Sequence, residues 1–168
     1  MTTSEASKQL RLLDPHYLVP ASPRRIILHW TAGGKNATNY DRKFYHLLIE
    51  QDGTLVWGYH KISDNDSTRD RDYAAHTRGA NTKTIGVSLC GMRGSRERPF
   101  EPGPDPITHA QYEIGCRAIA ELCAHYDIPV NKTTVMNHGM VEANLGIEQR
   151  QKWDVCVLPW KLSLSFAE

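Results

Sequence analysis

The sequence predicts an α/β fold: a single domain in which a central mixed β-sheet is flanked by helices. Three observations predict this. The chain has 168 residues, about the size of one domain, and its 40% hydrophobic and 23% charged residues are typical of a globular protein. Short apolar runs typical of strands lie on both sides of one long amphipathic segment. These runs do not alternate strictly with helices, which favours a mixed sheet over a doubly wound parallel one.

The first expected elements follow an N-terminal arm. Residues 1–23 are predicted to form this arm, which ends in a proline-containing run at 20–23. The apolar run 26–28 predicts a buried strand. Thr38, with Asp41 three residues later, resembles a capping box and predicts a short helix at about 38–44.

A hairpin and a third strand are expected next. Apolar runs at 45–50 and 55–59 flank Asp52-Gly53, a strong signal for a tight hairpin. Residues 60–83 are polar and are expected to form a loop. The run 84–90 predicts another strand, and the prolines and glycines of 91–106 predict a long surface loop.

The one strong helix is predicted to begin after Thr108 and to end before Ile128-Pro129. Its apolar spacing places Cys116 and Cys123 on the buried stripe. A last strand is expected at 133–136, followed by irregular structure from about residue 144. We expect the domain to span 24–160, with a tail at 161–168.

Charge and composition argue against several function classes. A formal net charge of +1 gives no general attraction to nucleic acid or anionic membranes, so neither is an expected partner. No apolar run is long enough to predict membrane insertion. The first ten residues are polar and resemble no signal peptide, so we expect synthesis in the cytoplasm. No C-x-x-C pair occurs, and reduced thiols are expected at the four cysteines Cys90, Cys116, Cys123 and Cys156.

Two histidines follow predicted strands, and both are candidate metal ligands. His29 ends the first strand and His138 follows the last one; Asp154 comes later in the chain. Two histidines and one carboxylate form a known catalytic zinc set that leaves a fourth position for water. Their separation is too long for a local metal motif, so ordinary structural roles remain an alternative. Cys156 is a rival third ligand, because in an extended segment it projects to the same side as Asp154.

Several stretches together resemble the zinc-dependent N-acetylmuramoyl-L-alanine amidases, the group of amidase-type phage lysozymes and peptidoglycan recognition proteins. They occur in the family's order and span roughly residues 24–160. The stretches are Ile27-Leu28-His29-Trp30-Thr31-Ala32, Tyr45-His46-Leu47-Leu48-Ile49, Asp52-Gly53-Thr54, Ala75-His76, Asn81 with Thr84-Ile85-Gly86-Val87, His138 and Lys152-Trp153-Asp154. The resemblance implies this family's fold and hydrolysis of the amide bond between N-acetylmuramic acid and the L-alanine of the stem peptide.

The resemblance also implies a site with one catalytic Zn²⁺. His29, His138 and Asp154 match the metal ligands, with Asp154 favoured over cysteine as the third. Tyr45 and Lys152 match catalytic residues. Zinc activates water and polarises the carbonyl, a lysine can stabilise the developing oxyanion, and a tyrosine can pass a proton to the leaving amine.

The substrate side of the site is less sharply defined. His76 matches a histidine beside the substrate groove, and Arg78 is a candidate partner for stem-peptide carboxylates, as are Arg42 and Lys43. The chain departs from the family after His138, where an acidic residue is displaced to Glu142. We therefore assign no catalytic role to Glu142.

The expected partner is peptidoglycan or a muropeptide, bound by a monomer. A phage or prophage endolysin, made in the bacterial host cytoplasm and acting in the periplasm, is the favoured setting. A cytosolic muropeptide-recycling amidase, a secreted toxin or other bacterial amidase, and a non-catalytic peptidoglycan-binding module are the alternatives. Because such modules typically lack the third metal ligand, the presence of Asp154 and Lys152 favours an enzyme.

Overall fold

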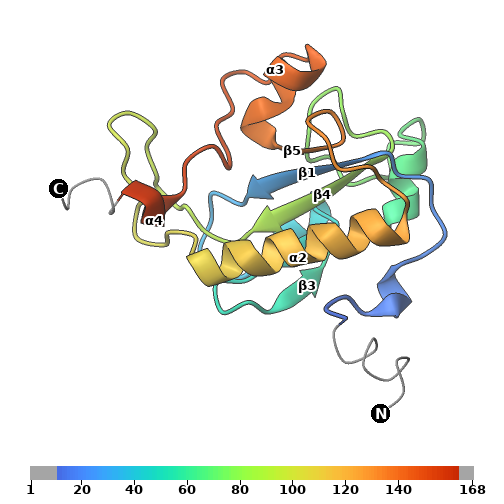
Figure 1. Ribbon diagram of the computed structural model, residues 1–168, viewed down its shortest axis with the longest axis horizontal. Helices are drawn as coiled ribbons and strands as arrows, with labels where there is room; N and C mark the ends of the chain where they lie inside the picture. Colours follow the sequence, from blue (N-terminus) through green and yellow to red (C-terminus); the bar gives the residue numbers. More distant parts are fainter. Residues whose placement is uncertain (1–10, 163–168) are drawn as a thin grey trace.

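A five-stranded sheet forms the centre of the molecule, with its strands in the order β3-β2-β4-β1-β5 (Figure 1). The computed structural model describes residues 11–162; the rest of the expected arm and tail lies outside the described residues. The strands are β1 Arg25–Trp30, β2 Leu47–Ile49, β3 Leu55–Trp57, β4 Thr84–Leu89 and β5 Val135–Asn137. β1 is parallel to β4 and β5, β2 is parallel to β4, and β3 is antiparallel to β2. The predicted mixed sheet is confirmed.

The two faces of the sheet have different neighbours. Alternate residues of β1, namely Ile26, Leu28 and Trp30, belong to the main hydrophobic cluster together with residues of α2. Ile27 belongs instead to a second cluster on the opposite face. Because side chains alternate along a strand, His29 shares the face of Ile27. The face away from α2 therefore carries the first candidate ligand.

Helix α2, His109–His125, lies along one face of the sheet (Figure 1). The Thr108 side chain accepts a hydrogen bond from the backbone N–H of Gln111, and the Gln111 side chain accepts one from the backbone N–H of Thr108. This capping box explains why the helix begins where the sequence predicted.

The prediction that Cys116 lies on the buried stripe of α2 is wrong, whereas Cys123 is buried. The stripe includes Gln111 and Gly115, which an apolar pattern does not count. Gln111 is fully buried. Its polar amide can be buried at low cost because Nε2 donates to the carbonyls of Ile49 and Cys90, 2.8 and 2.9 Å away.

The hairpin is confirmed, and its register pairs Leu47 with Trp57. The helix expected at 38–44 is only a 3₁₀ turn, Asp41–Lys43. The capping interaction that suggested it is present, because Asp41 Oδ2 accepts from the Thr38 N–H at 2.9 Å. The polar segment 60–83 contains one further 3₁₀ helix, Ile62–Asp66.

The C-terminal part is more helical than expected. β5 begins two residues later than predicted, because Thr133 and Thr134 form a turn with Asn131. Helix α3, Val141–Leu145, was not predicted and ends at Gly146 in the left-handed region at φ 69°. A short helix α4, Pro159–Leu162, lies at the C-terminal end of the described residues.

The last part of the expected arm contacts α2. Leu13 is buried in the main cluster, and the Leu12 and Leu13 N–H groups donate to the Glu121 carboxylate at 2.7 and 2.9 Å. Within residues 11–162, no helix is long and apolar enough to cross a membrane.

Candidate metal centre and its cavity

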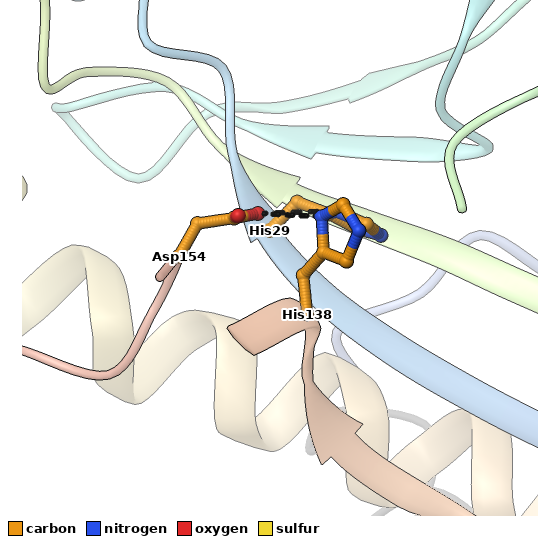
Figure 2. A group of neighbouring side chains, drawn as sticks. All are labelled: His29, His138 and Asp154. Atoms are coloured by element: carbon orange, nitrogen blue, oxygen red, sulfur yellow. Dashed lines mark hydrogen bonds and ion pairs between the residues drawn. The ribbon is translucent and has the colours of Figure 1, made fainter. Parts of the chain in front are cut away.

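Three side chains from distant parts of the chain meet on the sheet face away from α2. His29 comes from β1, His138 directly follows β5, and Asp154 comes from the loop before α4 (Figure 2). The Nδ1 atoms of His29 and His138 are 3.1 Å apart, and Asp154 Oδ2 lies 3.2 and 3.1 Å from them. All three residues are buried, and their ligand atoms lie within 4.8 Å of one another.

The chemistry of these donors fits zinc. Two imidazole nitrogens and a carboxylate oxygen are ligands of catalytic zinc, and three protein ligands leave a tetrahedral position open. Among the described residues, Cys156 is not part of this group. Its side chain is exposed, and its Sγ lies beside Gly139, where a Cβ atom would collide with it. The structure thus places Asp154, rather than Cys156, beside the two histidines.

Local packing explains how Asp154 reaches the histidines. The Trp153 ring packs edge-to-face on Trp30 of β1, with ring centroids 4.7 Å apart. The Asp154 carbonyl accepts a hydrogen bond from the Gly139 N–H at 2.6 Å. Trp153 therefore anchors this segment to the sheet, while Lys152 and Asp154 on either side of it line the cavity.

The charge state of the group suits a metal ion. Burial raises the pKa of the Asp154 carboxyl, but the neighbouring imidazoles of His138 and His29 lower it by more, so it stays ionised. Burial lowers the pKa of His29, opposed in part by Asp154. An ionised carboxylate and a neutral imidazole are the forms that bind metal.

His76 lies directly behind His29. His29 Nε2 is 3.2 Å from His76 Nδ1 and 3.3 Å from Thr77 Oγ1, and either atom can accept its N–H. Such a bond would leave His29 Nδ1 free for a metal. Burial lowers the pKa of His76 well below its usual value. His76, predicted to bind substrate, also lines the cavity. It therefore contacts both His29 and the cavity.

A cavity of about 430 Å³ lies over the group. Six of the residues predicted for the site line it, namely Tyr45, His76, Arg78, His138, Lys152 and Asp154. Arg78 and Lys152 are exposed at this cavity.

Tyr45 lies next to the group formed by His29, His138 and Asp154, called the metal group below. Its ring centroid is 5.2 Å from that of His29. Burial raises the pKa of the Tyr45 phenol, and the charge of Asp154 raises it further. The hydroxyl therefore remains protonated at neutral pH and can donate a hydrogen bond.

Two cavity residues, Gln149 and Arg150, escaped the sequence prediction. No local motif marks them, because they belong to an irregular segment after α3. Conversely, Arg42 and Lys43 are not among the described residues that line the cavity. The Arg42 Nε donates to the Trp57 carbonyl, and its guanidinium lies 4.4 Å from the Tyr59 ring centroid.

Comparison with solved structures gives similar folds at low sequence identity. Peptidoglycan recognition protein SD from Drosophila superposes with a TM-score of 0.50 and 15% identity, covering 74% of each chain. The endolysin LysCS from Clostridium intestinale gives 0.49 and 16%, covering 86% of this chain and 83% of its own. The endolysin of Thermus scotoductus bacteriophage Ph2119 gives 0.49 and 19%, covering 88% and 86%. At these identities the likeness concerns the fold alone.

Sequence comparison identifies the family. Curated proteins give no match to this chain. The sequence model of the family described as N-acetylmuramoyl-L-alanine amidase matches residues 19–155, which include the whole sheet and all three clustered metal-ligand candidates. The chain therefore belongs to the N-acetylmuramoyl-L-alanine amidase family.

Proposed function

We propose that the protein is a zinc-dependent peptidoglycan hydrolase that cleaves the amide bond between N-acetylmuramic acid and the L-alanine of the stem peptide. The observation that carries the proposal is the His29, His138 and Asp154 group at the wall of a cavity that also contains Tyr45 and Lys152. Membership of the amidase family supports the same bond.

Each residue has a role that suits its environment. His29, His138 and Asp154 would hold the zinc, which when bound supplies an activated water and polarises the scissile carbonyl. Lys152 donates to the carbonyl oxygen as it becomes negative. Tyr45, kept protonated by its burial, donates toward the leaving amine. Trp153 keeps Lys152 and Asp154 at the cavity by packing on Trp30.

The substrate side carries positive charge. Arg78 and Arg150 both line the cavity and are exposed. Guanidinium groups bind carboxylates through paired hydrogen bonds, and stem peptides carry free carboxylates. We therefore propose that these two arginines, with His76, contact the stem peptide.

We propose that the enzyme acts as a phage or prophage endolysin on the intact cell wall. The exposed cations at the cavity suit the stem-peptide carboxylates of the cell wall. A recycling amidase would instead act on soluble muropeptides. Comparing rates on intact sacculi and on soluble anhydromuropeptide distinguishes the two settings, and a strong preference for the soluble substrate would reject the endolysin role.

The activity itself is tested by mass spectrometry of the products that zinc-loaded protein releases from sacculi. We expect free peptides that begin with L-alanine, together with intact glycan chains. Asp154→Ala should lose zinc and all release, whereas the matched Cys156→Ser should retain both. New reducing sugar ends would contradict the proposal, as would full activity after exhaustive chelation. Loss of zinc in Cys156→Ser alone would contradict the ligand assignment.

A further inference from the structure

We propose that Gln149 is a positioning residue that fixes the tautomer of His138, so that its Nδ1 presents a lone pair to the metal. Gln149 is 4% exposed, and its Oε1 lies 2.9 Å from His138 Nε2 on the side of the ring away from Asp154. The inference rests on the proposed zinc site but not on the bond that the enzyme cleaves.

The orientation of the Gln149 amide is set by two backbone carbonyls. Its Nε2 lies 2.8 Å from the Arg78 carbonyl and 3.2 Å from the Ile147 carbonyl. Carbonyl oxygens only accept hydrogen bonds, so the NH₂ group must face them. The amide oxygen is then the atom that faces His138, and it too only accepts. His138 Nε2 must therefore carry the hydrogen.

The consequence appears at the other ring nitrogen. A neutral imidazole carries one N–H, so His138 Nδ1 has a free lone pair. This lone pair lies 3.1 Å from His29 Nδ1 and 3.1 Å from Asp154 Oδ2. Hydrogen bonds to the remote nitrogen orient metal-binding histidines and raise their basicity. His29 differs. His76 Nδ1 beside its Nε2 can only accept, because His76 Nε2 faces the Thr84 carbonyl at 3.3 Å, but the Thr77 hydroxyl there can accept or donate. Of the two candidate metal-ligand histidines, the geometry thus fixes the tautomer of His138 only.

The segment around Gln149 is built to hold it in place. Gly146 ends α3 in the left-handed region and turns the chain back toward the sheet. The Gln149 N–H lies 3.4 Å from the Glu142 carboxylate on α3. Through its bond to the Arg78 carbonyl, Gln149 also ties the metal ligand to a loop at the cavity. It therefore links ligand geometry to the position of a candidate substrate residue.

Two substitutions isolate the hydrogen-bond acceptor. Gln149→Met and Gln149→Glu both remove the amide donor to the Arg78 and Ile147 carbonyls, but only Glu keeps an acceptor for His138. Chelator competition should show zinc affinity about 10–100-fold weaker in Gln149→Met, whereas Gln149→Glu should bind zinc at least as tightly as the unaltered protein, because a carboxylate is a stronger acceptor for the His138 N–H. Glu148→Gln, at the exposed neighbouring position, is the matched control and should bind zinc like the unaltered protein. Equal affinities in the Met and Glu variants would overturn the inference.

The tautomer is measured directly by ¹⁵N NMR of the imidazole rings in zinc-free protein. We expect the Nε2–H form at His138 in the unaltered protein, and a mixture with the Nδ1–H form in Gln149→Met. An Nδ1–H form in the unaltered protein would overturn the inference even if no variant folds. If sacculi release no peptide while these results hold, only the proposed activity fails. If peptide is released but Gln149→Met binds zinc normally, only this inference fails.

Discussion

Lys152 combines an exposed side chain with a position at the metal group. It lines the cavity two residues before Asp154, and its charge contributes to lowering the pKa of His29. A charged ammonium can only donate hydrogen bonds, so in the proposed reaction Lys152 would serve the oxyanion rather than the metal. This interaction would strengthen as negative charge develops on the carbonyl oxygen, which would lower the barrier more than it tightens substrate binding.

Lys152→Ala should therefore lower kcat roughly a hundredfold or more, the scale of losing one oxyanion donor. Zinc content and melting temperature should stay unchanged, because the side chain is exposed. Turnover of sacculi, zinc analysis and a thermal melt measure these outcomes. Lys152→Arg should rescue little, since the planar guanidinium does not replace a compact charge. Near-normal turnover in Lys152→Ala would leave Tyr45 and the metal to carry the chemistry.

How far the site is predictable depends on how each residue reaches it. His29 and His138 lie at or just after strands, so their meeting follows from the parallel pairing of β1 and β5. Gln149 and Arg150 could not be predicted, because they arrive through an irregular segment. The left-handed conformations of Gly146 and Arg150 direct this segment. Backbone turns of this kind leave no spacing pattern in the sequence.

Among the elements, β4 carries none of the three candidate ligands but contacts His76, which lies next to His29. Gly86 lies in the middle of this strand, and a Cβ atom there would lie 2.5 Å from His76 Cγ and 2.6 Å from its Cδ2. The missing side chain is what leaves room for the His76 imidazole against the sheet, next to His29. A methyl group at this position must displace the ring.

Gly86→Ala should lower the free energy of unfolding by about 1–3 kcal/mol, the usual cost of overpacking a core. It should also weaken zinc binding, because His76 moves away from His29 Nε2. Gly34→Ala is the matched control, since a Cβ atom there meets nothing within 4 Å. Denaturant unfolding and chelator competition provide the readouts. A Gly86→Ala protein as stable as Gly34→Ala would show that His76 is free to move.

Elements with a local signal were predictable, and those set by packing were not. The hairpin follows from Asp52-Gly53, and α2 begins directly after Thr108 because the sequence contains the residues of the capping box. Cys116 was misplaced because Gln111, a polar residue, occupies the buried face, where it donates to the carbonyls of Ile49 and Cys90. The sequence alone does not show that Gln111 donates to these carbonyls, because this depends on how the helix packs on the sheet.

At the scale of the whole molecule, the sheet face away from α2 carries buried polar side chains next to the smaller hydrophobic cluster. His46 illustrates its chemistry, since it is buried and its pKa falls to about 4 because burial penalises the charged ring. Its Nδ1 accepts from the Gly86 N–H, and its Nε2 lies 3.0 Å from Asn65 Oδ1. Only the neutral Nε2–H form of His46 satisfies both partners. Protonation of Nδ1 would break the hydrogen bond from the Gly86 N–H.

The zinc-free fold should therefore lose stability in acid. The pKa of His46 is 6.5 in the unfolded state and about 4 in the folded state. At pH values between these two, His46 is protonated in the unfolded state but not in the folded state. Stability then rises with pH, and this contribution is lost as pH falls through the window, at about 1.4 kcal/mol per pH unit. Denaturant unfolding with chelator present should show a shallower pH slope in His46→Asn, whatever its stability at neutral pH. His16→Asn, at an exposed position, should keep the original slope. An unchanged slope in His46→Asn would mean that other groups control the acid response.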